Sequence, residues 1–204
     1  MSDASERGAP DAPSVDLVRR RVADVRPRST ADDPGAAVAT VLRERARGPE
    51  VLLIRRAEHP GDPWSGHMAF PGGRRDPGDP SLDHTAVRET HEELGLHLPS
   101  VGGLVGRLDD VPTHKTGLVV RPFVWVVDST PALRPNYEVD EVHWVALASL
   151  MSGERDTTFE LEWKGQRHRF PGYEVADRIV WGLTYRMLRI LFEVLERERP
   201  RADD

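Results

Sequence analysis

The segment from Ser81 to Gly95, SLDHTAVRETHEELG, constrains the fold most, because it combines a helical apolar pattern with a dense group of acids. At about 100° per residue, one arc of such a helix carries small or apolar side chains. The members of this arc are Ala86, Val87, Thr90 and Leu94, and the neighbouring arc carries Glu89, Glu92 and Glu93. Ser81 or Asp83 can cap the start of the helix, and Gly95 can end it. The sequence therefore predicts a helix whose carboxylates lie beside its buried side.

Such an acidic helix has two interpretations, a solvated surface or a cation site. A run of charges is most often a solvated helix face. Here, however, the like charges of Glu89 and Glu93 repel each other at i,i+4 spacing, so we expect a compensating positive charge. Mg²⁺ prefers oxygen ligands, and a backbone carbonyl from the glycine turn FPGG, at Gly73, can join the carboxylates. Arg88 precedes Glu92 by four residues and can pair with a neighbouring carboxylate.

The rest of the chain alternates helix-like and strand-like segments without a strict repeat. Residues 1–14 lack apolar periodicity and are predicted to be a flexible tail, followed by a single domain over residues 15–204. We expect helices at 15–25 and 178–198, strands at 36–44, 50–57, 117–128 and 140–147, and a hairpin over 158–170 that turns at Lys164 and Gly165. Residues 58–80 are too rich in glycine and proline for regular structure. This order predicts an α+β domain with a mixed β-sheet.

Composition limits the classes of function. The chain has 204 residues, a formal net charge of −6 and no cysteine. Disulfides, thiol catalysis and cysteine zinc sites are therefore excluded, and no overall positive field would attract nucleic acid. Neither a signal-peptide core nor a membrane-spanning run is present in the sequence. We therefore expect a cytoplasmic protein that binds neither nucleic acid nor membranes.

The segment GGRRDPGDPSLDHTAVRETHEELGL resembles the Nudix box. Its second half matches the box except that Thr90 stands where an aliphatic residue is more common. In its first half, Asp79 replaces the usual glutamate, and the gap from Asp79 to Arg88 is one residue longer. The resemblance implies a Nudix-like α/β/α sandwich with a mixed sheet between helices. It also implies a hydrolase that uses Mg²⁺ or Mn²⁺.

The lengthened box resembles the coenzyme A pyrophosphatase branch of the Nudix family, as do LLIRRA, GHMAFPGG, YEVDEVHWVAL and IVWGLTYRML. This similarity runs from about residue 36 to residue 195 and implies hydrolysis of coenzyme A or acyl-coenzyme A to 4′-phosphopantetheine and 3′,5′-ADP. The implied metal ligands are Glu89, Glu92, Glu93 and Gly73, and the implied catalytic residues are Glu89 and Arg88. The alternatives are a pyrophosphatase for ADP-ribose, nucleotide sugars or oxidised nucleotides, and an inactive ligand sensor with the same fold.

Substrate contacts are expected from the segments before the box. Arg55 and Arg56 end a predicted strand, so only one of them can face the site, and the resemblance favours Arg56 as a phosphate contact. Trp64 and His67 lie in the following loop and can line a substrate pocket, the tryptophan by stacking on a base; loop packing is the alternative. The branch has a second arginine in this region, whereas residues 57–66 contain none.

Two further groups of residues have competing interpretations. Glu138, Asp140 and Glu141 precede a strand, and we expect them to be solvated at its edge rather than to join the metal site. The final helix, with Trp181, Leu188, Leu191 and Leu195, is expected to pack in the core or to form a homodimer surface.

Overall fold

The computed structural model describes residues 13–61, 64–113, 117–129, 132–163 and 165–196. Most of the predicted tail therefore lies outside the described residues. Within them, the main sheet follows the strand order β3-β2-β1-β7-β5, with β4 and β1, β6 and β7, and β8 and β2 as further pairs. The strands are β1 (Ala36–Arg43), β2 (Glu50–Arg56), β3 (Met68–Ala69), β4 (Gly72–Arg74), β5 (Gly102–Arg107), β6 (Val111–Pro112), β7 (Val119–Val127) and β8 (Val139–Ala146). Strands β1 and β7 run parallel, and the other pairs are antiparallel, so the sheet is mixed as predicted.

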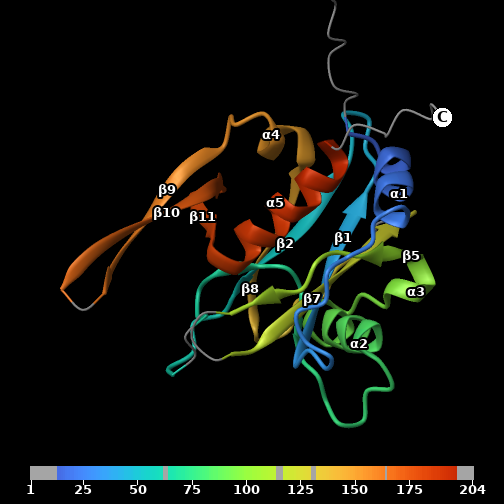
Figure 1. The fold of residues 1–204 in the computed structure, drawn as a ribbon, viewed down its shortest axis with the longest axis horizontal. Helices are drawn as coiled ribbons and strands as arrows, with labels where there is room; N and C mark the ends of the chain where they lie inside the picture. Colours follow the sequence, from blue (N-terminus) through green and yellow to red (C-terminus); the bar gives the residue numbers. More distant parts are fainter. Residues whose placement is uncertain (1–12, 62–63, 114–116, 130–131, 164, 197–204) are drawn as a thin grey trace, which may run out of the picture.

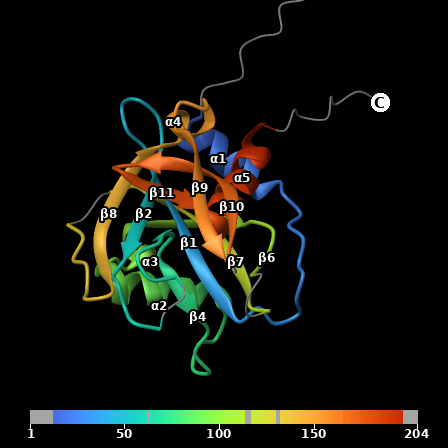
Figure 2. The ribbon, with the colours of Figure 1, turned by 90° about the vertical axis from the view of Figure 1, so that its left-hand side faces the viewer.

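Helices cover both faces of this sheet, which confirms the predicted α/β/α layering (Figures 1 and 2). Helices α2 (Leu82–Leu94) and α3 (Leu98–Val101) lie on one face, and α1 (Val15–Ala23) and α5 (Gly182–Glu196) lie on the other. A short helix, α4 (Leu147–Met151), follows β8. No helix in the described part of the chain is long and apolar enough to span a membrane.

The alternation of side chains along β1 explains why the core has two halves. Val38 and Leu42 pack with the α1 and α5 side, whereas Ala39 and Val41 pack with the α2 and α3 side. Successive side chains of a strand point to opposite faces, and a strand that is covered on both faces becomes apolar throughout. The small alanines on the α2 side let this helix approach the sheet closely, which places its carboxylates near the backbone of β4.

A second, three-stranded sheet consists of β9 (Asp156–Trp163), β10 (Gln166–Val175) and β11 (Arg178–Trp181). Strands β9 and β10 form the predicted hairpin, which projects from the body of the molecule (Figure 1). Lys164, half of the predicted turn, lies outside the described residues.

The prediction of one helix over 178–198 is wrong in its first four residues, which form β11. Gly182, with a φ of 61°, marks the change from strand to helix. Trp181 therefore belongs to the small sheet, where its ring stacks on Phe159 at a centroid distance of 4.0 Å. Pairing of β11 with β10 outweighs the local helical periodicity because it completes a sheet that the sequence pattern does not show.

The segment 58–80 also contains more regular structure than predicted, since β3 and β4 lie within it. Met68 pairs with Arg55 of β2, and Arg74 pairs with Ala36 of β1. These short strands form through pairing with distant segments. Local glycine and proline content therefore does not reveal them.

Candidate active site

Helix α2 begins and ends where the sequence predicts. Ser81 is its extended N-cap, and Gly95 ends it in the left-handed conformation with a φ of 65°. Its apolar side packs into the core together with β1 and β7. Glu93 lies at the edge of this packed side and is only 1% exposed.

Two glycines of β4 bring the backbone up to the carboxylates of α2. The Gly72 N–H donates a hydrogen bond of 2.9 Å to Oε2 of Glu93. A Cβ atom at Gly73 would lie 2.5 Å from Cδ of Glu89 and 2.6 Å from its Oε1, which is too close for any real side chain. Glu89 and Glu93 thus lie against the backbone of this turn, and a side chain at Gly73 would displace the Glu89 carboxylate.

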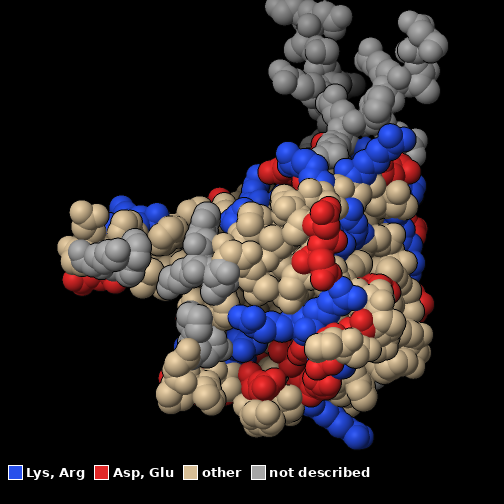
Figure 3. Space-filling view, turned by 60° about the horizontal axis from the view of Figure 1, so that its bottom comes forward, with Lys and Arg blue, Asp and Glu red and all other residues tan. Residues whose placement is uncertain are grey.

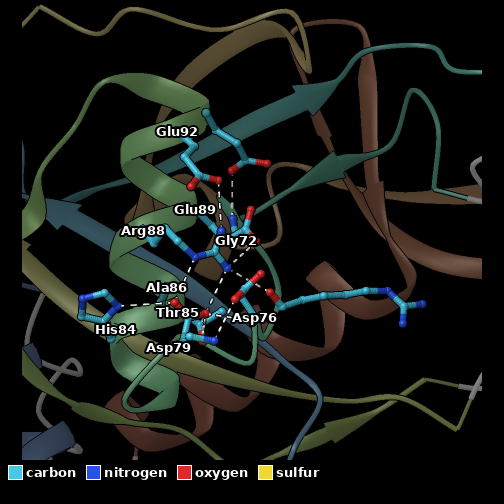
Figure 4. A network of polar contacts seen from close by, with 12 residues as sticks. Gly72, Asp76, Asp79, His84, Thr85, Ala86, Arg88, Glu89 and Glu92 are labelled. Carbon is cyan, nitrogen blue, oxygen red and sulfur yellow. Dashed lines mark hydrogen bonds and ion pairs between the residues drawn. The ribbon is translucent and has the colours of Figure 1, made fainter.

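Arg88 connects the acids of the site (Figure 4). Its guanidinium makes two 3.0 Å hydrogen bonds to Asp79, and it lies 3.0 Å from carboxylate oxygens of both Glu89 and Glu92. It also donates a hydrogen bond of 3.1 Å to the carbonyl of Arg74. The predicted pairing of Arg88 with a neighbouring carboxylate is confirmed, and it extends to three carboxylates.

Asp79, which stands where the Nudix box usually has glutamate, is part of the site. It is buried, and besides Arg88 it accepts hydrogen bonds from the Asp76 N–H at 3.0 Å and the Thr85 hydroxyl at 2.9 Å. The Arg88 guanidinium holds the pKa of Asp79 well below its usual range. Asp79 thus anchors Arg88 despite its shorter side chain and the longer gap. The available signal in the sequence was the acid itself, nine residues before Arg88.

Burial gives the two inner glutamates an unusual affinity for protons. It raises the pKa of Glu93 to about 8, although the Gly72 hydrogen bond and the charge of Arg56 act in the opposite direction. Burial also raises the pKa of Glu89, against the effect of Arg88. The charge of Glu138 contributes to the increase at both residues, which indicates that this acid lies near the cluster. Figure 3 shows acidic side chains gathered in one patch with basic side chains along its border.

The donors of this patch fit a hard divalent cation in their chemistry. They are the carboxylate oxygens of Glu89, Glu92 and Glu93. Of these three residues Glu92 reaches solvent, since its side chain is 53% exposed. Within the described residues, no three acidic or histidine side chains converge as a ready-made cation site. Mg²⁺ needs only one or two protein carboxylates when water and substrate phosphates complete its shell. The arrangement therefore suits an ion that binds together with a phosphate substrate.

The predicted substrate residues lie in different surroundings. Nη1 of Arg56 lies 3.8 Å from Oε1 of Glu93, so Arg56 does face the acids. Arg55 instead pairs with Asp140 and Glu58, as expected from the alternation of a strand. The structure therefore brings Arg56, and not Arg55, to the site.

The ring of His67 lies toward the small sheet. The His67 ring packs edge-on against Trp181 at 5.0 Å, toward the small sheet. The His67 N–H donates to the carbonyl of Trp64 at 3.1 Å, and its own carbonyl accepts from Arg56 at 3.0 Å. His67 thus supports the backbone of Arg56, and its ring takes part in the loop packing that was the alternative interpretation.

Of the three acids expected before a strand, Glu138 precedes β8, whereas Asp140 and Glu141 lie within it. Asp140 pairs with Arg55, and Glu141 pairs with Arg178 and His143. Glu138 is exposed. Glu138 is thus exposed to solvent, as expected for an acid at a strand edge, whereas Asp140 and Glu141 form ion pairs.

The chain belongs to the Nudix hydrolase family, because the NUDIX domain matches residues 33–164. The match contains the glycine turn, Asp79 and the whole of α2.

Relatives agree with this assignment. The chain is 36% identical over 170 residues to the mitochondrial coenzyme A diphosphatase NUDT8 of Homo sapiens, an alignment that covers 81% of this chain and 71% of that protein. It is 35% identical over 147 residues to the uncharacterized Nudix hydrolase NudL of Yersinia pestis, which covers 70% of this chain and 71% of that protein. An uncharacterized protein of Schizosaccharomyces pombe is 36% identical over 155 residues, or 71% of this chain, and the chain spans 47% of its length.

Proposed function

We propose that this chain is a metal-dependent diphosphatase that hydrolyses coenzyme A or acyl-coenzyme A to 4′-phosphopantetheine and 3′,5′-ADP. The observation that carries the hydrolase proposal is the network in which β4 holds Glu89 and Glu93 while Arg88 joins Glu89, Glu92 and Asp79. The substrate proposal is supported by the 36% identity to a coenzyme A diphosphatase.

In this proposal Glu89, Glu92, Glu93 and the Gly73 carbonyl would hold Mg²⁺ or Mn²⁺. When bound, such an ion would supply charge neutralisation for the diphosphate and a lower pKa for the attacking water. The raised pKa values of Glu89 and Glu93 reflect negative charge that burial leaves poorly solvated. A divalent cation offsets this charge, so the same burial that raises the proton affinity favours the ion.

The chain's own groups have complementary roles. Glu89 accepts a proton from the attacking water, because it is the partly buried carboxylate that lies against the turn. Arg88 acts as a positioning residue that fixes the orientation of Glu89. Arg56 binds a phosphate of the substrate from the side of Glu93.

The decisive experiment incubates the purified chain with a panel of diphosphates, with and without Mg²⁺ or Mn²⁺, and identifies the products. Coenzyme A is expected to give 4′-phosphopantetheine and 3′,5′-ADP, and excess chelator is expected to abolish turnover. Turnover that persists in chelator would contradict the metal mechanism. If ADP-ribose or an oxidised triphosphate were preferred by tenfold, about 1.4 kcal/mol, the coenzyme A assignment would be wrong. No turnover of any member would favour a ligand sensor.

Substitution of the glutamates tests the site itself. Glu92→Gln and Glu93→Gln keep the side-chain volume but remove a charged ligand, so kcat is expected to fall by about two orders of magnitude or more. Glu193→Gln is the matched control, since Glu193 is an exposed helical glutamate on α5, on the other face of the sheet. Near wild-type rates in both site variants would show that the acidic cluster is structural.

A further inference from the structure

Arg74 differs from the other arginines around the catalytic turn. Arg75 pairs with Asp33, Arg88 pairs with Asp79, and Arg56 lies near Glu93. Among the described residues, no hydrogen bond or ion pair is made by the Arg74 side chain, which is exposed. The residue that follows Gly73 thus carries a positive charge without a carboxylate to neutralise it.

The backbone of Arg74 is nevertheless fixed to the catalytic network. Its carbonyl accepts a hydrogen bond from Arg88, whose guanidinium also contacts Glu89. In the sheet, Arg74 pairs with Ala36 of β1. The position of Arg74 relative to Glu89 is therefore set by the same contacts that build the site.

The side chain of Arg74 leaves β4 on the side away from the acids. The Gly73 face of the strand is turned toward Glu89, and adjacent residues of a strand point to opposite faces. On its own side, Arg74 lines a hollow of ≈ 330 Å³ together with Gly35 and Leu118. Asp33 also lines this hollow, but its carboxylate is engaged by Arg75 at 2.5 Å.

Strand β4 alone lies between the hollow and the acids. In the described sheet β4 pairs only with β1, and on its other edge Glu93 binds the Gly72 N–H and Arg88 binds the Arg74 carbonyl. A ligand that spans β4 can place one anionic group near Glu89 and another near Arg74. Coenzyme A has this form, because one ribose separates its diphosphate from a phosphate monoester.

We infer that Arg74 binds the phosphate monoester of the substrate and thereby selects substrates that carry one. The inference rests on the proposed function. A guanidinium binds a phosphate through two parallel hydrogen bonds, which an ammonium group cannot reproduce. Arg74 thus supplies the second basic contact that residues 57–66 lack.

The test compares kcat/KM for coenzyme A and for dephospho-coenzyme A, which lacks the monoester. The wild-type protein is expected to prefer coenzyme A by about tenfold or more. Arg74→Ala should remove most of this preference, because kcat/KM should fall much more for coenzyme A than for dephospho-coenzyme A, and Arg74→Lys should keep part of the preference. Arg20→Ala is the control, because Arg20 is an exposed arginine on α1. Circular dichroism verifies that each variant is folded.

A binding measurement separates this inference from the proposed function. Calorimetry with 3′,5′-ADP and 5′-AMP requires no turnover, and only 3′,5′-ADP should lose affinity in Arg74→Ala. Suppose that coenzyme A is hydrolysed, but Arg74→Ala lowers kcat/KM equally for both substrates or lowers the affinity equally for both nucleotides. The monoester contact is then wrong, while the proposed function stands. If coenzyme A is not hydrolysed and 3′,5′-ADP binds no better than 5′-AMP, both proposals fail.

Discussion

At the scale of single residues, the site depends on how closely backbone and carboxylates approach each other. Gly73 has no side chain at a position where a Cβ would overlap Glu89. Asp79 neutralises Arg88 from a buried position, so that Arg88 can orient Glu89 and Glu92. Both residues act on the geometry of other groups, and geometry errors of about 1 Å can cost about 100-fold in rate.

Gly73→Ala is expected to lower kcat by about tenfold to 100-fold, because the added methyl group must displace the Glu89 carboxylate. The thermal midpoint should change little, since the displaced group is a side chain at the edge of the core. Gly103→Ala is the matched control in another strand, where a Cβ would meet nothing within 4 Å. Equal activity of the two variants in the diphosphatase assay would contradict the role of Gly73.

Asp79→Asn should lower both activity and stability, because Arg88 would lose its charged partner in a buried environment. Loss of one partner from a buried pair costs about 3–5 kcal/mol, and urea unfolding measures this change. Asp79→Glu keeps the charge and should recover part of both properties. Asp76→Asn is the control in the same loop, where the side chain is exposed and accepts a hydrogen bond from Gly78. A stable and active Asp79→Asn would show that Arg88 needs no anchor.

At the scale of elements, the segment between α1 and β1 is fastened to the sheet by one buried acid. Asp110 accepts hydrogen bonds of 2.7 and 2.9 Å from Arg121 of β7, and one of 3.1 Å from the Thr30 N–H. Its own N–H donates to the Arg28 carbonyl. This segment carries Asp33 and Gly35, so Asp110 also positions one wall of the hollow beside Arg74.

Asp110→Asn should destabilise the protein near neutral pH by about 3–5 kcal/mol, and the deficit should shrink in acid. Burial acts to raise the pKa of Asp110, but the hydrogen bonds from Arg121 and Thr30 outweigh it and hold the pKa below its ordinary value. The stabilisation is therefore complete above the unfolded pKa of about 3.9 and is lost as pH falls through the lower folded pKa. Urea unfolding between pH 7 and pH 3 tests this. Asp128→Asn, in an exposed pair with Arg19, should change stability by less than about 1 kcal/mol.

At the scale of the whole molecule, helices cover both faces of the main sheet (Figure 2), and one of them, α2, carries the acids of the site. Helix α2 is packed by its apolar side, and this packing forces Glu93 into a buried position. Without a cation, the buried acids therefore lower the stability of the folded protein. Binding of a cation should therefore stabilise the entire protein.

Mg²⁺ or Mn²⁺ at about 100 times its Kd should add about 2.7 kcal/mol, which corresponds to roughly 5–10 °C in Tm for a domain of this size. Glu93→Gln should reduce this shift strongly, whereas Glu193→Gln should keep it. Differential scanning fluorimetry with and without the ion measures the effect. A shift of the same size in Glu93→Gln would place the bound ion elsewhere.

The sequence alone determined the features that depend on neighbours along the chain. Helix α2 and its terminal glycine were predicted because the apolar arc, the acids and the αL residue lie within fifteen positions. The choice between Arg55 and Arg56 followed from the alternation of a strand, together with the family resemblance. These patterns are local, so propensity and period suffice to read them.

Only the tertiary structure decided the features that depend on distant partners. Strands β3, β4 and β11 exist because other strands pair with them, although their own residues suggest a loop or a helix. Asp79 proved central because it is buried against Arg88, and His67 turned toward Trp181 because β11 lies beside β3. Long-range pairing and burial set these positions, and neither leaves a periodic signal in the sequence.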